Sequence, residues 1–241
     1  MRRLFLAAVL LPLVPQTCIA ADLPQVTITA QRDAEWGSYR HAYKASAFFA
    51  FFTRTRPLIQ AHMQIRPREP GTRLEGLKVQ LASESMTLDI PVDELGRSTL
   101  PMLKKAYDED AVLRLNRQKG HYRFSGRYSI KERDDGVYSM AMLREACEQV
   151  LSAQRASGYM FRLIGKKCTG VRFIYPLADS AAVDLRSADG KAVSIAAADA
   201  EPFESGTLGQ YKVADVRFGS WPAAADVIAA KRPLAIGTVY E

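Results

Sequence analysis

The sequence has few of the residues on which most catalytic and metal sites depend. Its 241 residues include three histidines and three cysteines, and none of the histidines pairs with another histidine or with a cysteine at the spacing of a metal site. Neither of the serine-nucleophile patterns Gly-x-Ser-x-Gly and Ser-x-x-Lys occurs. Phosphate-binding glycine loops and the pattern of a calcium loop are missing as well. We therefore assign no metal ligand, no cofactor and no catalytic residue.

The first twenty residues have the pattern of an export signal. A pair of arginines precedes an apolar run at residues 4–14, and Cys18-Ile19-Ala20 supplies small residues before a cut between Ala20 and Ala21. The apolar run is too short to remain in a bilayer as a spanning helix. We expect a mature periplasmic chain without a transmembrane helix. Lipid attachment at Cys18 is the alternative, although the residues before it lack the aliphatic character of a lipoprotein signal.

The chain is basic, with a formal net charge of +7 and an isoelectric point near 9.4. A charge of this sign often indicates a nucleic-acid partner. Export would separate the protein from nucleic acid, so anionic components of the cell envelope are the expected partners instead.

Cleavage at Ala20 would leave two cysteines, Cys147 and Cys168, in a compartment where thiols are oxidised. Two cysteines allow one intramolecular bridge, and closing a loop of about 22 residues would stabilise the fold by roughly 3 kcal/mol. Two separate buried thiols are the alternative. A redox-active pair is disfavoured because the spacing is far from Cys-x-x-Cys.

A capped helix is predicted in the middle of the chain. Ser139 is a suitable N-cap and Tyr138 can pack onto Leu143, while apolar residues recur with a period near 3.6 and place Cys147 on the inward face. Gly158 can close the helix in a left-handed conformation. Residues 159–164 and 171–175 then resemble strands because they are rich in β-branched and aromatic side chains.

A second helix is predicted at residues 34–53. Its second half, residues 45–52, is apolar nearly all round and contains four phenylalanines. Such a segment is usually buried between layers of structure. The functional alternative is a groove lining or a membrane-contacting face, because Arg54 and Arg56 follow directly.

Most of the remaining chain alternates between apolar and polar residues, as half-buried strands do. The expected strands are residues 59–65, 77–81, 86–92, 111–117, 121–131, 183–186, 192–195, 211–218 and 234–240. The turn at Lys119-Gly120 predicts a hairpin between 111–117 and 121–131, and an alanine-rich helix is expected at 223–230.

These elements predict an α+β fold that is mostly antiparallel β. A sandwich-like N-terminal half would precede the central amphipathic helix and a smaller β-rich C-terminal half. The turn-rich segment 133–136 marks a boundary. The predicted organisation is a signal peptide at 1–20, a helix with an antiparallel β-sandwich-like domain at 21–136, and a helix with a β-rich domain at 137–241.

One group of side chains suggests a binding surface. Arg123, Arg127 and Lys131 share one parity of a predicted strand, and Arg114 on the predicted partner strand would extend them into a basic stripe. Such a stripe could contact lipopolysaccharide phosphates, acidic lipid headgroups or cell-wall polymer. The alternative is a solvated sheet face whose cations discourage edge-to-edge pairing.

Several short motifs between residues 35 and 176 occur in a familiar order. They are Ser38-Tyr39-Arg40, Leu100-Pro101-Met102-Leu103, Ala111-Val112 and Gly170-Val171-Arg172-Phe173. This order resembles a family of periplasmic proteins of Gram-negative bacteria that is built on a domain of unknown function. The resemblance implies a periplasmic location and no particular activity.

The leading hypothesis is a non-catalytic periplasmic protein that binds or supports a cell-envelope component. Its partner would be an anionic envelope component or another periplasmic protein. The alternative is a hydrolase of envelope polymers with a site assembled from distant residues. A pocket with a close acid/base pair would favour the enzyme, whereas a shallow basic or aromatic groove would favour the binder.

Overall fold

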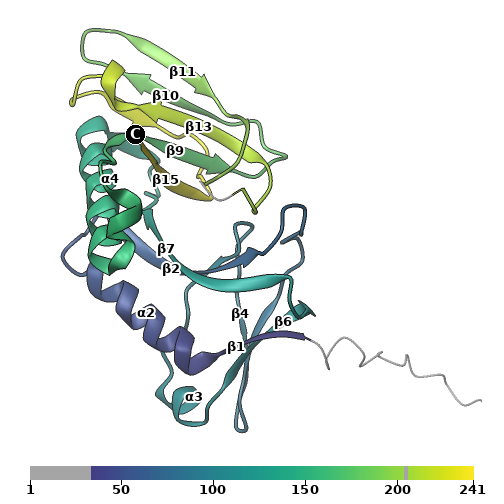
Figure 1. The fold of residues 1–241 in the computed structure, drawn as a ribbon. Helices are drawn as coiled ribbons and strands as arrows, with labels where there is room; N and C mark the ends of the chain where they lie inside the picture. The colour runs from purple at the N-terminus through teal and green to yellow at the C-terminus, as the bar shows by residue number, and fades with distance from the viewer. Residues whose placement is uncertain (1–33, 204–205) are drawn as a thin grey trace, which may run out of the picture.

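The computed structural model of the protein describes residues 34–203 and 206–241 (Figure 1). The predicted signal peptide lies outside the described residues. The elements of the first half are β1 (Ala34–Ser38), α2 (Tyr39–Thr53), β2 (Ile59–Pro67), β3 (Val79–Ala82), β4 (Thr87–Ile90), β5 (Arg97–Ser98), α3 (Lys104–Asp108), β6 (Val112–Gln118) and β7 (Tyr122–Ile130).

The second half contains α4 followed by turns and further strands. Its elements are β8 (Val137–Ser139), α4 (Met140–Gln154), η1 (Arg155–Tyr159), η2 (Met160–Leu163), β9 (Cys168–Tyr175), β10 (Ala182–Arg186), β11 (Ala192–Ala196), β12 (Ala198–Ala200), β13 (Tyr211–Arg217), η3 (Phe218–Ser220), β14 (Asp226–Ile228) and β15 (Ala235–Tyr240).

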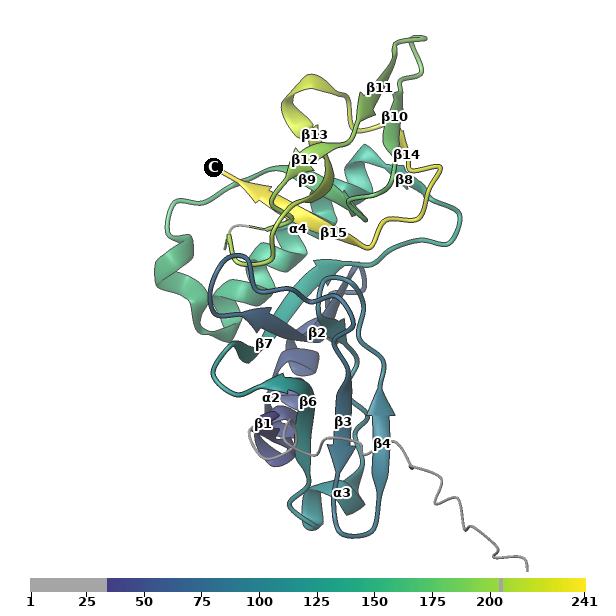
Figure 2. The same ribbon diagram turned by 90° about the vertical axis from the view of Figure 1, so that its right-hand side faces the viewer.

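The described strands form three sheets with antiparallel pairing. Two sheets have four strands, in the orders β1-β6-β3-β4 and β11-β10-β14-β8, and the third has seven, in the order β12-β13-β9-β15-β7-β2-β5. The four-stranded sheet with β3 and β4 lies at the opposite end of the molecule from β10 and β11 (Figure 2). The predicted α+β fold with mostly antiparallel sheets and a central helix is confirmed. The sandwich-like packing stays a prediction.

The seven-stranded sheet joins strands from both halves of the chain. β2, β5 and β7 precede residue 136, whereas β9, β12, β13 and β15 follow it. The junction is narrow, because β15 and β7 pair only at Ile236 and Ile130. Beyond that pair the two strands diverge, as Figure 1 shows between β15 and β7. The predicted division into two domains at this boundary stays a prediction.

Helix α4 forms as its sequence predicts. The hydroxyl of Ser139 accepts a hydrogen bond from the backbone N–H of Met142 at 3.1 Å, which satisfies one of the free donors of the first turn. The apolar face of α4 is buried against the seven-stranded sheet together with Tyr138, and it includes Leu143 and Cys147. Burying a large aliphatic side chain stabilises by about 1.5–3 kcal/mol. The packing of this face therefore holds the helix in place.

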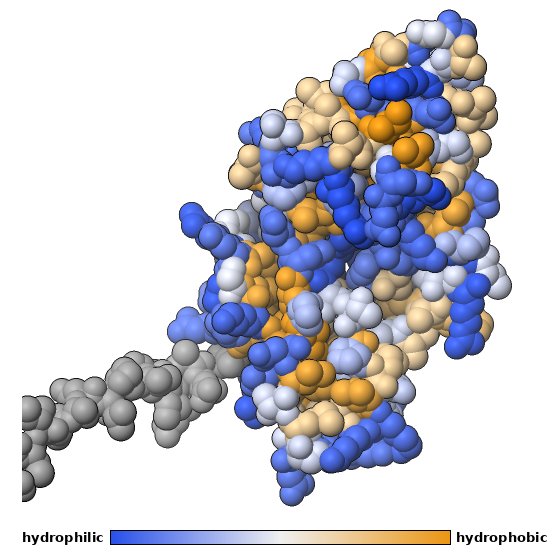
Figure 3. Space-filling view, turned by 180° about the vertical axis from the view of Figure 1, so that it is seen from behind, coloured by the Kyte–Doolittle hydropathy of each residue, from blue (hydrophilic) through white to orange (hydrophobic). Residues whose placement is uncertain are grey.

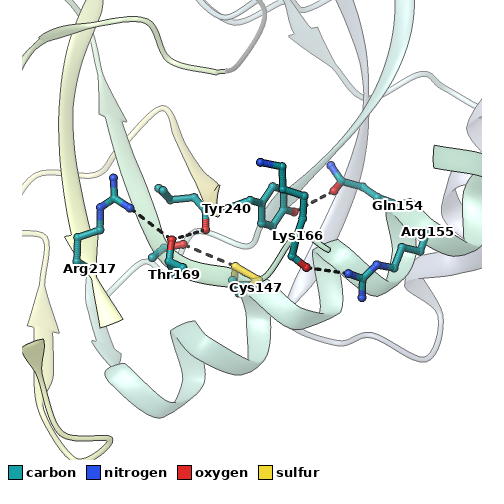
Figure 4. Close-up of a disulfide and its surroundings, with 10 residues drawn as sticks. Cys147, Gln154, Arg155, Lys166, Thr169, Arg217 and Tyr240 are labelled. Carbon is teal, nitrogen blue, oxygen red and sulfur yellow. Dashed lines mark hydrogen bonds between the residues drawn. A yellow bond between two sulfur atoms is a disulfide. The ribbon is translucent and has the colours of Figure 1, made fainter. Parts of the chain in front are cut away.

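The two cysteines that follow the predicted cleavage site lie at disulfide distance, as predicted. Cys147 is on α4 and Cys168 begins β9, and their Cα atoms are 6.0 Å apart (Figure 4). This separation is within the range of a protein disulfide. The bridge fastens the central helix to the sheet.

The predicted helix at 34–53 is wrong in its first five residues. Residues 34–38 form β1, in which Trp36 pairs with Arg114 and Ser38 with Val112 of β6. The hydroxyl of Ser38 then accepts a hydrogen bond from the backbone of His41, so the helix begins one residue later. A capping serine ends the strand and starts the helix, which periodicity alone did not reveal.

The predicted strand at 159–164 is also wrong. These residues form turns η1 and η2, and most of their apolar side chains are exposed. Gly158 and Gly165 have φ angles of 100° and 74°, which only glycine adopts readily. The chain therefore turns at both ends of the segment, which pairs with no described strand. Strand propensity depends on packing against a neighbouring strand, so it does not make this segment a strand.

Two further expectations fail because of strand pairing. The alanine-rich segment 223–230 is not a helix, since β14 pairs with both β10 and β8 and buries Ala225, Val227 and Ala229 in alternation.

The hairpin of residues 111–131 does not form either. β6 pairs with β1 and β3, whereas β7 pairs with β2 over nine residues. The longer pairing satisfies more backbone groups than a hairpin across a short turn would.

Candidate ligand clefts

The structure divides the predicted basic stripe between two sheets. Arg123 and Arg127 lie on β7 in the seven-stranded sheet, whereas Arg114 lies on β6 in a four-stranded sheet. Lys131 is exposed just beyond the end of β7. The four residues therefore do not share one sheet face, because the hairpin that would have aligned them is absent. Their role in binding stays a prediction.

Arg127 is held in place more firmly than a surface residue of a stripe would be. Its guanidinium lies over the ring of Phe203 at 3.8 Å, and its Nε donates a hydrogen bond to the side chain of Gln64 at 2.8 Å. A stacked arginine at such a distance is positioned by the ring. Arg127 is therefore fixed at the edge of the gap between the two parts of the seven-stranded sheet.

A cleft of about 500 Å³ occupies the place where β7 and β15 diverge. Four of its lining residues are cations, and none of its lining residues is acidic. We call it the cationic cleft. Its charged residues are Arg66 from β2, Arg127 from β7, Arg162 from η2 and Lys166 from the loop before β9. Residues about 100 positions apart in the chain thus meet at one site.

Arg66 carries the least compensated charge in the cationic cleft. Its Nε and Nη2 atoms are buried and have no hydrogen-bond partner among the described residues. Arg123 lies opposite it on β7. Burial lowers the pKa of the Arg66 guanidinium, and the charge of Arg123 acts in the same direction. Arginine nevertheless stays protonated in proteins, so Arg66 is a cation that lacks an anion.

Tyrosines complete the cationic cleft without adding negative charge. Burial raises the pKa of Tyr128, so its phenol stays protonated at neutral pH. Tyr240 donates a hydrogen bond from its hydroxyl to Gln154 at 2.9 Å (Figure 4). The cleft therefore presents cations and neutral polar groups, which is the lining that a bound anion requires.

A second cavity adjoins the first and is mainly apolar. It has a volume of about 400 Å³ and lies between α2 and the neighbouring strands, where Ala42, Met63 and Phe124 contribute to its walls. Phe49 and Gly126 line both cavities. A Cβ atom at Gly126 would come within 2.1 Å of the Phe49 ring. Only glycine allows this ring to lie against β7, where the apolar cavity meets the cationic cleft.

The second half of α2 is not buried between layers, so that prediction is wrong. Phe48 and Phe51 are 48% and 59% exposed, whereas Phe49 packs edge-on against Tyr128 at 5.2 Å between ring centres. One face of the helix thus lines a groove, as the alternative proposed. The other face is open to solvent in the described structure.

The surface seen from behind is hollowed near its middle. Hydrophilic residues gather there in a band between the two ends of the molecule, with smaller apolar patches beside them (Figure 3). The same middle region contains the narrow junction of the seven-stranded sheet. The polar surface therefore concentrates where the two parts of that sheet meet.

Comparisons with family models, with curated proteins and with solved structures give no match. The resemblance to a periplasmic family therefore stays a prediction. Within the described residues, no group of three or more histidine, cysteine, aspartate or glutamate side chains is placed to hold a metal ion. No helix in the same part of the chain has the length and apolar character needed to cross a membrane.

One histidine lies beside a serine at a distance typical of a nucleophile and its base. His62 Nε2 is 3.1 Å from Ser129 Oγ. Ser129 is completely buried, and Arg97 donates a hydrogen bond to it at 3.4 Å. A substrate could not reach the serine without unfolding the sheet around it. The pair is therefore a structural contact. No sequence pattern predicted it, because the two residues lie on different strands.

His62 predicts a loss of stability in mild acid. Burial and the charge of Arg97 lower its pKa to about 4. The unfolded chain binds a proton near pH 6.5 and the folded chain does not until about pH 4, so stability falls as pH decreases between these values. The shift corresponds to about 3 kcal/mol, which partial exposure reduces to roughly 2 kcal/mol.

Urea unfolding of the wild-type protein and His62→Gln at several pH values between 7 and 4 measures this effect. The variant should lose less stability than the wild type over that range. His121→Gln is the matched control, because His121 is exposed in the turn before β7. An identical pH dependence in the wild type and in His62→Gln would contradict the prediction.

Proposed function

We propose that this protein binds an anionic amphiphile of the cell envelope without chemically changing it. The anionic headgroup would occupy the cationic cleft, and the apolar chain would occupy the adjoining cavity beneath α2. The observation that carries the proposal is the guanidinium of Arg66, whose Nε and Nη2 atoms are buried without a hydrogen-bond partner in a cleft lined by cations. An anion there would remove the cost of an uncompensated buried charge.

The neighbouring apolar cavity favours amphiphiles over the other anionic components of an envelope. A cell-wall polymer or a free phosphate would leave that cavity empty. A lipid would bury apolar surface in it, which is the dominant favourable term in most binding. Phe49 and Gly126 line both cavities, so the cavities are adjacent, and the Phe49 ring that lies against Gly126 would have to move aside for one molecule to occupy both.

A periplasmic location is part of the same proposal, and the cysteines support it. The cysteine pair at disulfide distance is typical of proteins in oxidising compartments, and the proposed location is the periplasm. The alternative partner, another periplasmic protein, has no observation in its favour beyond exposed apolar side chains. The alternative activity, hydrolysis, has in its favour the contact of His62 with Ser129, and that serine is completely buried.

Binding of dodecyl phosphate below its micelle concentration tests the proposal. Calorimetry should detect tighter binding of dodecyl phosphate than of dodecyl maltoside, which has the chain without the charge. Glycerol phosphate, which has the charge without the chain, should also bind more weakly. Affinity for dodecyl phosphate should fall with added salt, because screening weakens charge attraction.

Two substitutions localise the binding. Arg66→Gln should raise the Kd for dodecyl phosphate by about 10- to 100-fold, since a hydrogen bond to a charged group contributes about 1.5–3 kcal/mol. Ala45→Trp should obstruct the apolar cavity, whose lining includes Ala45. It should weaken the binding of dodecyl phosphate without affecting the binding of glycerol phosphate. Arg114→Gln is the matched control, because Arg114 lies on another sheet. Equal affinity in Arg66→Gln and Arg114→Gln would exclude the cationic cleft as the site.

A further inference from the structure

The segment from Tyr159 to Lys167 projects apolar side chains into solvent. Phe161 is 86% exposed, Ile164 is 71% exposed and Met160 is 58% exposed. Isolated exposed apolar residues are ordinary on protein surfaces, but three within five positions form a patch that requires an explanation. We call residues 159–167 the apolar loop.

The apolar loop is held rigidly at its base. The guanidinium of Arg155 donates hydrogen bonds to the carbonyls of Leu163 and Lys166, the latter at 2.8 Å (Figure 4). The backbone N–H and C=O of Lys167 bond to Glu241 at the end of the chain. The disulfide of Cys168 follows immediately. Exposure of the apolar side chains is therefore a property of an ordered structure.

The charge of the apolar loop indicates the kind of surface that it binds. Arg162 lies between the apolar side chains, Lys166 and Lys167 follow them, and the segment contains no acidic residue. The C-terminal part of α2, which packs beside η1, adds the exposed Phe51 and the cation Arg54. Apolar side chains that can enter a bilayer, surrounded by cations that attract anionic headgroups, are typical of interfacial membrane binding.

We infer that the apolar loop docks the protein on the surface of an anionic lipid bilayer. Phe161 and Ile164 would insert among the acyl chains near the headgroups, while the basic side chains contact lipid phosphates. This docking does not depend on ligand binding in the clefts. It would place the cationic cleft, to which Arg162 and Lys166 contribute, beside the membrane.

Flotation with lipid vesicles tests the inference. Protein starting at Ala21 should float with vesicles of equal parts phosphatidylglycerol and phosphatidylcholine, and it should float poorly with phosphatidylcholine alone. The double variant Phe161→Ser/Ile164→Ser should lower the partition coefficient by about tenfold or more, since each large apolar side chain contributes strongly to partitioning. Lys167→Gln should lower it about fivefold, because one basic residue near the surface is lost.

Controls separate this inference from the proposed function. Leu88→Ser/Val193→Ser removes two exposed apolar residues on β4 and β11 and should leave flotation unchanged. Phe161→Ser/Ile164→Ser should still bind monomeric dodecyl phosphate, whereas Arg66→Gln should still float. Failure to float, equal flotation with both vesicle types, or equal flotation of the wild type and the loop variant would each overturn the inference. A concentration-dependent dimer that the loop variant abolishes would also overturn the inference, because the apolar loop would then bind a second copy of the protein.

Discussion

Replacing Arg97 with methionine is expected to lower the free energy of unfolding by about 3–5 kcal/mol, because it breaks a buried charge network on one side only. The Arg97 side chain is 7% exposed, and its Nε lies 2.8 Å from Asp93 and its Nη1 3.3 Å from Glu132. The Glu132 side chain is itself only 11% exposed. Without the guanidinium, Glu132 keeps the hydrogen bond from Gln60 but lacks a cation in a largely buried site, and Asp93, which is 31% exposed, loses its ion pair.

Arg97 also connects the two halves of the chain. Its Nη2 donates a hydrogen bond to the carbonyl of Leu234, which precedes β15, while its other contacts are to residues before 136. Direct pairing between β7 and β15 is limited to Ile130 and Ile236. The guanidinium therefore reinforces a narrow junction of the seven-stranded sheet. Its removal should weaken the coupling between the parts on either side.

Urea unfolding followed by circular dichroism measures the effect of Arg97→Met. A loss of this size should lower the melting temperature by roughly 10 °C. Arg232→Met is the matched control, because Arg232 pairs with Asp134 on the surface, where the two side chains are 68% and 91% exposed. Exposed pairs contribute 0–1 kcal/mol in most cases, so this control should change stability by less than about 1 kcal/mol. Equal losses in the two variants would contradict the assignment of Arg97 to a stabilising network.

Replacing both Cys147 and Cys168 with alanine should lower the free energy of unfolding by roughly 3 kcal/mol. The two residues are 21 positions apart, and a bridge between them restricts the unfolded chain. Cys147 is completely buried on α4. Loss of the bridge should lower the melting temperature by about 6–12 °C for a chain of this size. Monomeric dodecyl phosphate should still bind at low temperature, because neither cysteine lines the clefts.

Thiol titration is the direct check on the bridge. Protein that starts at Ala21 should show no reactive thiol when it is denatured without a reductant and two after reduction. Two reactive thiols before reduction would mean that the helix and β9 are held by packing alone. In that case the alanine variant should lose only the small contribution of the buried Cys147 side chain. The stability measurement and the titration must therefore agree.

The local sequence determined the parts of the fold that depend on neighbouring residues. A capping serine, an apolar period near 3.6 and a closing glycine predicted α4, and the inward position of Cys147 followed from the same pattern. Alternation predicted the strands β2 and β7, and the structure confirms both strands, but Gln64 and Ser129 on their expected polar faces are completely buried. These features follow from the geometry of one helix or one strand.

Only the tertiary structure decided which strands pair. β6 and β7 are joined by a short turn but enter different sheets, so the basic stripe expected from their pairing divided between two surfaces. Residues 223–230 have helical propensity, but within them β14 pairs with both β8 and β10 as a strand. Pairing depends on which distant backbone groups find partners, and no local pattern records that choice.

The cationic cleft shows the same limit most clearly. Of its cations only Arg127 was a candidate from the sequence, and the candidate Arg123 lines the other cavity instead. Arg66, Arg162 and Lys166 were not candidates, because they lie on a strand, a turn and a loop far apart in the chain from one another or from β7. The sequence by itself determined the basic charge, the capped helix, the two cysteines and the strand faces. Tertiary structure alone brought the cations together, because β7 and β15 pair at one position and then separate, leaving a gap that their side chains line.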